Sequence, residues 1–469
     1  MTEKFEFTDS IKRNLYIMIG CGLAGLAWAF LGSPENHHSR FWSNILINAY
    51  YFTGIGLFGM FVVAATQLAY GGWQVLIRRV LLSMPGFIFI GAALITLVMV
   101  GAHLDLHNLY HHWTHPHAGD TIVGDKQGYL NLPFWSIRLL VYLVLWLVFT
   151  VWMPRFYAEK NLFEISNYKF SKILSAMYLV VFATTESFVS WDLIMSIDPH
   201  WYSTLFGWYN FASYGCAAWA FAILLVITLK SWGYLSLVNE NHIHDLGKFL
   251  FGFSIFWTYL WFSQFMLQWY GNIPEDTKFW VKRFDIGYFK FTIFFALFLN
   301  FLMPLLILIS RGAKRNYKTL GFMACVVIFG HYVDFFNYVF FEPNVNTAAT
   351  AEHHASVSTA HTTLYAQHTD HAPAEPAAAA TDAAPADHTA TPAATAVVPA
   401  TQDGHGAHTE ESHEHSEPVK HFAVIGLPEL LTFIGFVGMF LFMFFNRLAM
   451  YPLIKEDDPY LKESIKHNI

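Results

Sequence analysis

Residues 173–196 read "ILSAMYLVVFATTESFVSWDLIMS", an apolar run in which Glu186 and Asp192 are the only charged residues. A helix needs about 20 mostly apolar residues to cross the hydrocarbon core of a bilayer, and this stretch is long enough. The chain of 469 residues has the same character throughout, because 55% of it is hydrophobic and 13% is charged. Soluble domains average about 25% charged residues, so the composition indicates an integral membrane protein, for which no nucleic-acid partner is expected.

Apolar stretches of this length recur along the chain and predict an all-α, polytopic membrane protein with ten transmembrane helices. The predicted spans are 13–32, 45–66, 86–104, 134–153, 173–196, 207–229, 249–270, 287–309, 317–340 and 422–446.

The segments outside the spans differ in character. The first span follows Lys12 and Arg13 as a signal peptide would, but it is too long and no small-residue cleavage site follows it, so we expect a retained anchor helix. Residues 343–420 are rich in Ala, Thr, Pro, His and acids, a composition that cannot bury enough apolar surface to fold. The predicted organisation is an N-terminal segment (1–12), a membrane domain (13–342), a disordered insert (343–420), a tenth span (421–446) and a tail (447–469).

The positive charges predict the orientation. With ten spans both termini lie on one side, and most of the 27 Lys and Arg residues fall in the termini and connections of that side. Because cytoplasmic loops carry an excess of Lys and Arg, both termini are predicted to be cytoplasmic. The His-rich connections 103–133 and 343–420 then face outward.

The connection 67–86, "QLAYGGWQVLIRRVLLSMPG", is amphipathic and contains Trp73 and the pair Arg78–Arg79. Such a segment is typical of a helix that lies along the cytoplasmic membrane interface before the next span begins.

The sequence offers no cysteine-based cofactor site. Cys21, Cys216 and Cys325 all lie inside predicted spans, and no C-x-x-C-H, iron–sulfur or zinc pattern is present, so we interpret them as small core residues. A haem between helices would need two histidines on facing spans at one depth. Only His103 and His331 have the required depth, and each stands alone, so neither a haem nor a metal site is expected in this chain.

Ionisable side chains inside a membrane helix are costly and normally face the bundle interior or a wet cavity. With the predicted orientation, the fifth and ninth spans run outward. Glu186 then lies near mid-membrane, while Asp192, His331 and Asp334 lie in the outer half. Asp192 shares a helical face with Thr185, seven residues earlier.

The seventh span adds a polar stripe at helical spacing, and glutamines that continue a tryptophan stripe indicate a polar cleft. The stripe consists of Ser254, Trp257, Trp261, Gln264 and Gln268. His103 and Asp105 end the third span at the same level, where Arg138 and Lys290 open the fourth and eighth. Buried polarity is therefore predicted to gather in the outer half of the membrane.

This distribution fits two functions. One is a site for the head group of a quinone (menaquinone or ubiquinone), because a quinol loses two protons on oxidation and needs a base nearby. The other is a half-channel that carries protons between mid-membrane and the outer face. The structural alternative is that Asp192 and Asp334 only pair with Arg138 or Lys290 and hold helices together.

Four stretches carry a resemblance to a known family: "QGYLNLPFWSIR" (127–138), "SWDLIMSIDPHWYSTLFGWY" (190–209), "FSQFMLQWYGNIPED" (262–276) and "GHYVDFF" (330–336). They resemble the NrfD-like integral membrane family and, more narrowly, the second NrfD-like subunit of bacterial alternative complex III, a quinol:cytochrome c oxidoreductase. The resemblance covers all ten spans and excludes the insert 343–420.

The resemblance implies two four-helix bundles, spans two to five and six to nine, with the first and last spans peripheral. It implies a bacterial inner-membrane location and no covalently bound cofactor in this chain. The implied partners are a paralogous NrfD-like subunit, a periplasmic iron–sulfur subunit, multihaem and monohaem cytochrome c subunits that hold the haem, and a terminal oxidase in some assemblies. The paralogue is expected to hold the better-formed quinol site. For the subunit that this chain resembles, the resemblance implies either quinone binding, or a role in proton conduction and scaffolding.

Carried over to this sequence, the acids of the family motifs are Asp192 in "SWD" and Asp334 in "HYVDFF", where His331 precedes the latter. Asp198 and His200, in "DPHW", are expected at the outer surface, where they could dock a periplasmic partner. For Asp192 we favour the proton path. A further alternative is an NrfD-like subunit of another oxidoreductase, such as a polysulfide or nitrite reductase.

Overall fold

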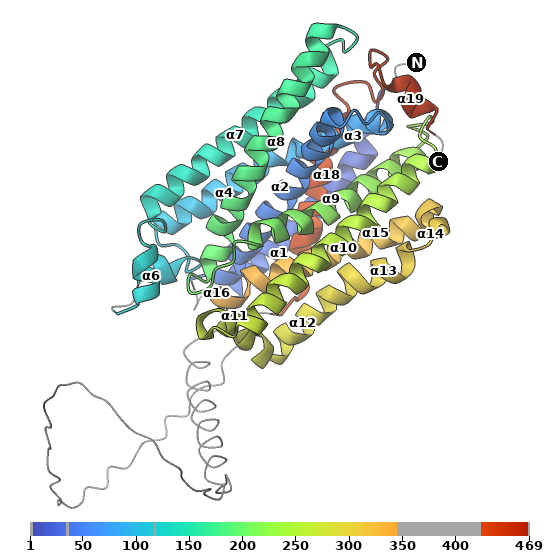
Figure 1. The fold of residues 1–469 in the computed structure, drawn as a ribbon. Helices are drawn as coiled ribbons and strands as arrows, with labels where there is room; N and C mark the ends of the chain where they lie inside the picture. The colour runs from blue at the N-terminus through green and yellow to red at the C-terminus, as the bar shows by residue number, and fades with distance from the viewer. Residues whose placement is uncertain (1–2, 34–36, 117–118, 345–423, 468–469) are drawn as a thin grey trace, which may run out of the picture. The chain divides into compact units, whose positions relative to one another are not determined.

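The computed structural model describes residues 3–33, 37–116, 119–344 and 424–467, which form helices and no strands (Figure 1). Apart from its first two residues, the predicted insert 343–420 lies outside the described residues.

Within the described residues, ten helices are long and apolar enough to cross a membrane, and this confirms the predicted all-α class. Seven of these spans consist of one helix each: α1 (Asp9–Leu31), α2 (Ser39–Leu68), α7 (Leu132–Glu159), α9 (Phe206–Ser231), α10 (Glu240–Gly271), α15 (Tyr317–Val339) and α18 (Leu427–Leu448). The other three are composite: α3 (Arg78–Ser83), η3 (Met84–Phe87) and α4 (Ile88–His103); α8 (Ile165–Leu193) and η4 (Met195–Ile197); α12 (Gly287–Leu297), η5 (Phe298–Leu302) and α13 (Met303–Leu308). Short connecting helices are η2 (Trp73–Leu76), α5 (His111–Thr114), α6 (Thr121–Lys126), α11 (Pro274–Asp285), α14 (Arg311–Arg315), α16 (Phe341–Asn344) and α19 (Leu461–Ile465).

The spans pack as two four-helix bundles with the first and last spans outside them, as the family resemblance implied. One bundle contains α2, α3–α4, α7 and α8, and the other contains α9, α10, α12–α13 and α15 (Figure 1). The bundles meet where α2 and α8 pack against α9, while α18 packs against α1, α2 and η3. The most apolar window of α2 is 94% buried and that of α1 is 22% buried, so α2 is central and α1 peripheral.

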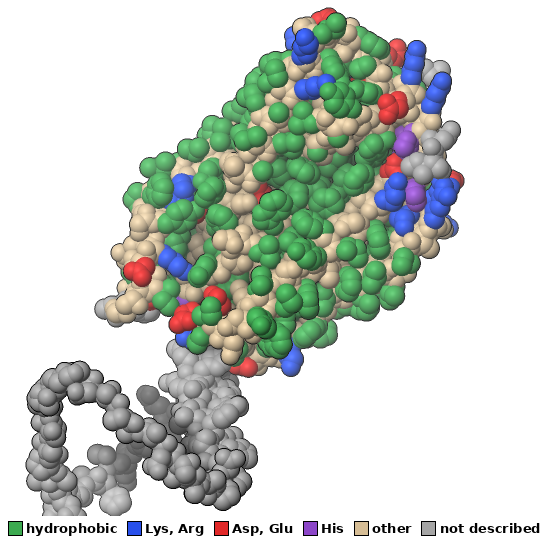
Figure 2. Space-filling model, viewed as in Figure 1, with side chains coloured by type: hydrophobic (Ala, Val, Ile, Leu, Met, Phe, Trp, Pro, Cys, Tyr) green, Lys and Arg blue, Asp and Glu red, His purple; other side chains and the backbone are tan. Residues whose placement is uncertain are grey.

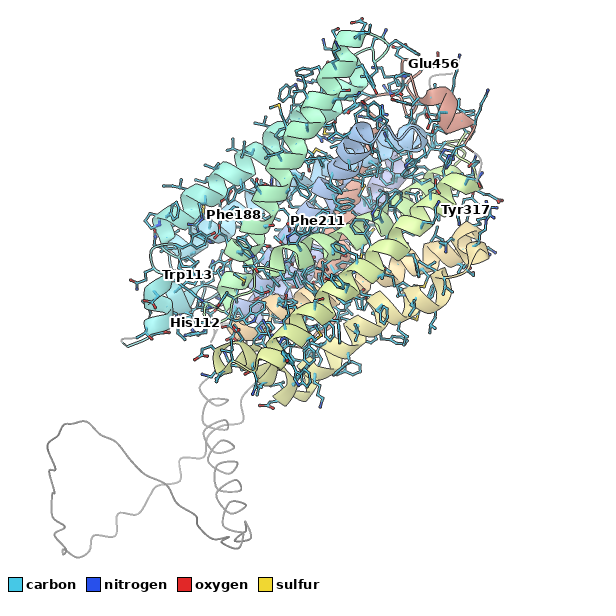
Figure 3. All side chains as sticks on the ribbon, in the orientation of Figure 1. His112, Trp113, Phe188, Phe211, Tyr317 and Glu456 are labelled. Carbon is cyan, nitrogen blue, oxygen red and sulfur yellow. The ribbon has the colours of Figure 1, made fainter. Side chains whose placement is uncertain are left out.

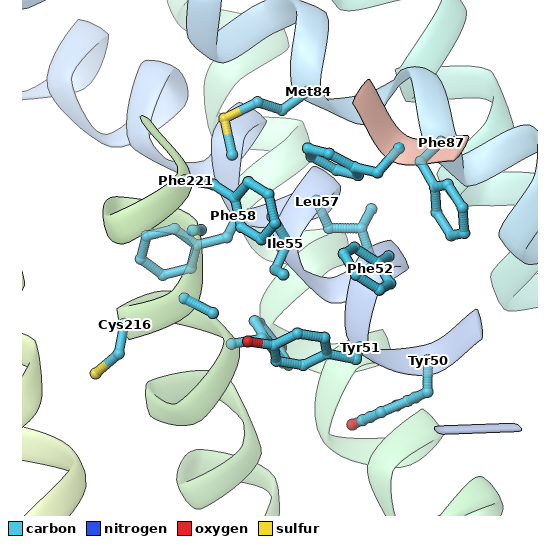
Figure 4. Packing of buried hydrophobic residues seen from close by; sticks show 14 of the residues in the cluster. Tyr50, Tyr51, Phe52, Ile55, Leu57, Phe58, Met84, Phe87, Cys216 and Phe221 are labelled. Carbon is cyan, nitrogen blue, oxygen red and sulfur yellow. The ribbon is translucent and has the colours of Figure 1, made fainter. Parts of the chain in front are cut away.

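Aromatic side chains fill the centre between the bundles. The ring of Phe52 on α2 lies 5.7 Å from Phe87 of η3 and 6.0 Å from Phe221 of α9 (Figure 4). It also lies 5.7 Å from the ring of Phe440 on α18. Such aromatic pairs contribute about 0.5–1.5 kcal/mol each beyond the area that they bury. One side chain of α2 therefore joins three other elements of the fold.

The pair α1–α18 depends on glycine. A Cβ atom added to Gly435 of α18 would lie 2.3 Å from the Cα of Gly22 on α1, so the two backbones touch. Small residues permit this close approach between membrane helices. α18 is also fixed to α2, because Arg40 donates to both carboxylate oxygens of Glu429 at 2.6 Å.

Helix α10 begins nine residues before its predicted start at 249. Asn239 caps the helix, because its side chain accepts from the backbone N–H groups of Asn241 (2.9 Å) and His242 (3.2 Å). The polar first turns are covered by the end of the chain, where His467 contacts Asp245 at 2.6 Å. Apolar periodicity could not reveal a helix start that is polar yet buried.

The segment 67–86 is not one interfacial helix. After α2 ends at Leu68 it contains the short η2, and α3 and η3 begin the third span at Arg78. Arg78 and Arg79 are 8% and 9% exposed, and Arg78 forms an ion pair with Asp458 of the C-terminal tail. The two arginines are therefore covered by protein. The local sequence pattern could not reveal this cover, because the tail lies far away along the chain.

The interpretation of the cysteines as three core residues is also wrong in part. Cys216 is buried within the central packing (Figure 4), but Cys21 is only partly buried and Cys325 is exposed.

The chain begins and ends at the same end of the helices (Figure 1). Leu453 N–H donates to the carbonyl of Glu3 (2.8 Å), and the Asn239 side chain donates to the carbonyl of His467 (3.1 Å). We call this end the terminal end, and the opposite end, which carries α5, α6, α11 and α16, the loop end. Figure 2 shows hydrophobic side chains over most of the visible face between them, with Lys, Arg and His side chains gathered at the terminal end.

Candidate functional site

Asp192 is held in a buried ion pair inside the first bundle. Arg138 of α7 donates from Nε and Nη2 to the two carboxylate oxygens of Asp192 at 3.1 and 2.8 Å, and both side chains are less than 9% exposed. Arg138 also donates to the carbonyl of Tyr129 (3.0 Å), while Trp135 donates to the backbone carbonyl of Asp192 (2.9 Å). Both carboxylate oxygens of Asp192 therefore accept from Arg138. This ion pair between α7 and α8 is the structural role that the sequence left open as an alternative to a proton or quinone site.

Thr185 lies on the same face of α8 as Asp192, as its spacing predicted. Its hydroxyl accepts from Nε1 of Trp146 on α7 (2.8 Å). The face that carries Thr185 and Asp192 therefore joins α8 to α7.

Glu186 is the first of two buried carboxyl groups that have no ion-pair partner among the described residues. It is 5% exposed, its Oε2 receives only a long contact from Ser187 (3.4 Å), and its Oε1 has no hydrogen-bond partner there. The side chains of Tyr50 on α2 and Tyr214 on α9 are its electrostatic neighbours, so its polar surroundings come from both bundles. Glu186 thus faces the junction of the two bundles, away from Asp192.

Asp334 is the second such carboxyl, and it is surrounded by neutral donors inside the second bundle. Tyr209 and Ser213 of α9 donate to it at 2.5 and 3.2 Å, and Trp257 Nε1 of α10 donates at 3.3 Å. His331, one turn earlier on α15, contacts the same Ser213 hydroxyl through Nδ1 at 2.9 Å. The predicted interaction of His331 with Asp334 therefore runs through Ser213.

The direction of these hydrogen bonds follows from the single proton of the Ser213 hydroxyl. If this proton is donated to Asp334, His331 must donate to Ser213 from Nδ1–H. Nε2 of a neutral His331 then carries a lone pair, and this buried atom has no partner within the described part of the chain. When His331 takes a proton at Nε2, its Nδ1 proton can pass to the Ser213 hydroxyl while the Ser213 proton passes to the carboxylate of Asp334. Rotation of the hydroxyl and return of the imidazole to its Nδ1–H form then reset the group.

The predicted polar stripe of α10 faces the interior. Ser254, Trp257, Trp261 and Gln264 are all buried, and Gln268 at the helix end is partly buried. Gln268 accepts from Nε1 of Trp280 on α11 (2.5 Å), whereas the side-chain oxygen of Gln264 has no hydrogen-bond partner among the described residues. The stripe therefore extends from Asp334 toward the loop end.

A small cavity continues from Asp334 in the same direction. It measures about 10 Å³, close to the volume that one water occupies, and it lies between Asp334 and Asn337 of α15 and Arg283 of α11. Pockets that hold organic ligands measure about 300–1,000 Å³. This cavity suits a water and is far too small for a quinone ring.

Beyond the cavity lies a group of charged side chains, the loop-end cluster, which consists of Asp198, Lys282, Arg283, Glu342 and His112. Lys282 Nζ lies 3.9 Å from a carboxylate oxygen of Asp198 and 3.3 Å from one of Glu342, so two buried acids share one ammonium. His112 lies 4.0 Å from the second oxygen of Glu342 and is labelled at the loop end in Figure 3.

The two acids of this cluster differ in protonation. Burial, together with the nearby charge of Asp198, raises the pKa of Glu342 to about 7. Burial also opposes ionisation of Asp198, but Lys282 and Arg283 outweigh it and hold the pKa of Asp198 below its usual value. Burial lowers the pKa of His112. Of the two acids, Glu342 is therefore the one whose protonated form its surroundings favour.

Several predicted site residues lie elsewhere. His103, Asp105 and Lys290 are exposed, and His103 contacts the Ser136 hydroxyl (2.7 Å). Lys290 therefore does not pair with Asp334, and His103 and His331 belong to different bundles.

The expectation that Asp198 docks a partner at the surface is wrong, because Asp198 is 6% exposed and faces Lys282. His200 is more accessible, with 39% of its side chain exposed, but it contacts Asp120 at 2.7 Å.

The sequence did not single out Glu342, Lys282, Arg283 or His112. These residues come from short connections that are far apart in the chain, and a charged residue in a connection is ordinarily solvated, so spacing carried no signal. In the part of the chain that the structure describes, no group of three His, Cys, Asp or Glu residues is arranged to hold a metal ion.

Comparison with models of known protein families finds none that matches this chain, and comparison with curated proteins finds no match either.

Proposed function

We propose that this chain is an integral membrane subunit of a respiratory quinol:cytochrome c oxidoreductase of the alternative complex III type, in which it transfers protons between the middle of the membrane and the loop end. The observation that carries the proposal is the pair of buried carboxyls, Glu186 and Asp334, that have no counter-charge within the described residues. An ionised carboxylate is costly to bury without a cation. Buried ionisable groups within membrane helices mark proton or substrate paths by default.

The proposed route begins at Glu186, which faces the junction of the bundles, and continues to His331, Ser213 and Asp334 across α9. From Asp334 the water-sized cavity leads to Arg283 and the loop-end cluster, where burial and the charge of Asp198 raise the pKa of Glu342. Asp192 is not part of this route, because Arg138 occupies both of its carboxylate oxygens.

The residues around Asp334 do not fit a quinone. The adjoining cavity is water-sized, and Tyr209, Ser213 and Trp257 already occupy the carboxyl. Within the proposed complex, quinol oxidation is therefore assigned to the paralogous NrfD-like subunit, and the haem and iron–sulfur groups to the periplasmic subunits.

The same proposal gives the location and orientation. The chain lies in a bacterial inner membrane with the terminal end in the cytoplasm, in keeping with the Lys and Arg residues of that end, and the loop end in the periplasm. The loop end is then the side on which protons are released and partners dock.

The test uses the purified complex reconstituted in liposomes. Asp334→Asn and Glu186→Gln are expected to slow proton release by on the order of 100-fold, because a positioned acid or base typically contributes that much to proton transfer. Asp105→Asn, which changes an exposed acid at the loop end, is the matched control and is expected to leave turnover and proton release unchanged.

Wild-type turnover and proton release in Asp334→Asn would overturn the proposal. Photolabelling with a quinone analogue separates the two sequence-based functions: label on the paralogue alone agrees with the proposal, whereas label beside Asp334 would replace it with quinone binding in this chain.

A further inference from the structure

A cavity at the terminal end is separate from the proposed proton route. It measures about 320 Å³ and lies between Arg78 and Arg79 of α3, Tyr157 of α7 and the tail residues 451–458. This volume falls at the lower end of the range for small-molecule sites. We call this cavity the tail pocket.

Arg79 is a cation of the tail pocket that no acid neutralises within the described residues. Its neighbour Arg78 is paired with Asp458, but Arg79 has no carboxylate within ion-pair distance among the described residues. Arg79 donates from Nη2 to the carbonyl of Arg447 (2.5 Å) near the C-terminal end of α18, and its guanidinium lies 4.8 Å from the ring centre of Tyr451. Nε of Arg79 is buried and has no hydrogen-bond partner there.

A second unneutralised guanidinium lies beside the first. Pro154 lacks an N–H group, so the carbonyl of Thr150, four residues earlier on α7, is left without its helical donor. Arg447 donates to this carbonyl from Nη2 at 2.9 Å, while its Nη1 is buried and has no partner among the described atoms. Arg79 and Arg447 are also electrostatic neighbours, so two like charges lie together without an acid between them.

Lys455 brings a third positive charge to the lining. Its Nζ donates to the backbone carbonyls of Lys160 and Tyr157, and no carboxylate lies within ion-pair distance in the described chain. The acids Glu456 and Asp457 are exposed at the surface, where Figure 3 labels Glu456 at the terminal end. The lining therefore contains two cations, Arg79 and Lys455, with no carboxylate at ion-pair distance within the described residues.

We propose that the tail pocket binds an anionic phosphate group, presented by a phospholipid head group or as free phosphate. Arginine forks are the side chains best matched to phosphate oxygens, and Arg79 lines the pocket without a carboxylate at ion-pair distance among the described residues. The pocket lies at the ends of α3 and α7, the level at which lipid head groups meet membrane helices, and basic pockets in this position bind anionic lipids. The inference is independent of the proton route.

The test uses the purified full-length chain in detergent and native mass spectrometry. We expect one dihexanoyl phosphatidylglycerol to bind in preference to dihexanoyl phosphatidylcholine, and Arg79→Gln to weaken this binding at least about tenfold, since a charge-assisted hydrogen bond is lost. Arg155→Gln is the matched control, because Arg155 lies on the same turn of α7 as the pocket but its side chain is 65% exposed, and it should leave the affinity unchanged.

Inorganic phosphate serves as the second probe. Phosphate binding that is lost in Arg79→Gln supports the site and identifies a free anion as its ligand, whereas binding of the phosphatidyl lipid alone identifies a head group. Equal binding of the two lipids, or an unchanged affinity in Arg79→Gln, overturns the proposal. Should Arg79→Gln fail to fold, Lys455→Gln on the tail must weaken binding several-fold, and an unchanged affinity in that variant refutes the proposal equally.

Discussion

Replacing Asp192 by Asn tests whether this acid is structural. The substitution keeps the size of the side chain but removes the negative charge that faces the guanidinium of Arg138 at 2.8 and 3.1 Å. Arg138 is 8% exposed, so water cannot replace the lost partner. It would retain only the carbonyl of Tyr129 and the adjacent rings of Tyr129 and Phe134, whose centres lie 3.7 and 4.3 Å away.

Breaking a buried ion pair by removal of one partner typically costs about 3–5 kcal/mol, because the other charge stays buried. We expect Asp192→Asn to lose this amount, less a small part that the two aromatic rings recover. A native protein is stable by about 5–15 kcal/mol, so the variant should fold but should unfold much more easily. Removing both charges, as in Arg138→Met with Asp192→Leu, should cost far less than Asp192→Asn alone.

The assay is equilibrium unfolding of the purified chain in mixed micelles, with proton release measured per folded complex. If Asp192 is structural, Asp192→Asn lowers the free energy of unfolding and the double variant recovers most of it, while proton release per folded complex is unchanged. A stable Asp192→Asn variant that has lost proton release would refute this reasoning and would return Asp192 to the proton path.

Two further predictions concern the loop end and the α1–α18 pair. Because burial and the charge of Asp198 raise the pKa of Glu342 to about 7 from an ordinary 4.5, the folded state holds a proton that the unfolded chain releases. The stabilisation that Glu342 contributes is complete below pH 4.5 and is lost as the pH rises to about 7. Glu342→Gln should abolish this decline in unfolding curves measured between pH 4.5 and 7.5, and a decline of unchanged size would contradict the assignment. Gly435→Val forces a side chain against the backbone of Gly22 and is expected to cost about 1–3 kcal/mol, measured by the same unfolding assay; wild-type stability would mean that α1 can shift at no cost.

The sequence was sufficient for the spans because the length and apolarity of a transmembrane helix are local properties. It was also sufficient to predict that Glu186 and Asp334 face the interior, since a carboxyl inside an apolar run is conspicuous wherever it packs. It could not decide that Asp192 meets Arg138 while Asp334 meets only neutral donors, because these contacts depend on which helices are neighbours.

The errors have related causes. Asp198 lies beside a proline turn, which is a surface signal, but α11 and α16 cover it and supply Lys282 and Glu342. Arg78 and Arg79 have the pattern of a membrane-interface segment, but the tail covers them. In both cases the covering segment lies far away in the sequence, so local pattern could not reveal it.

The C-terminal tail has a consequence for how the protein is made. Asp458 neutralises Arg78, Ser464 donates to the carbonyl of Trp73 (2.8 Å), and His467 contacts Asp245 (2.6 Å). These contacts join residues 458–467 to segments that leave the ribosome hundreds of residues earlier. The terminal end therefore closes only after residues 458–467 have been synthesised, and a chain that stops before Asp458 would expose an unneutralised arginine that quality-control proteases could recognise.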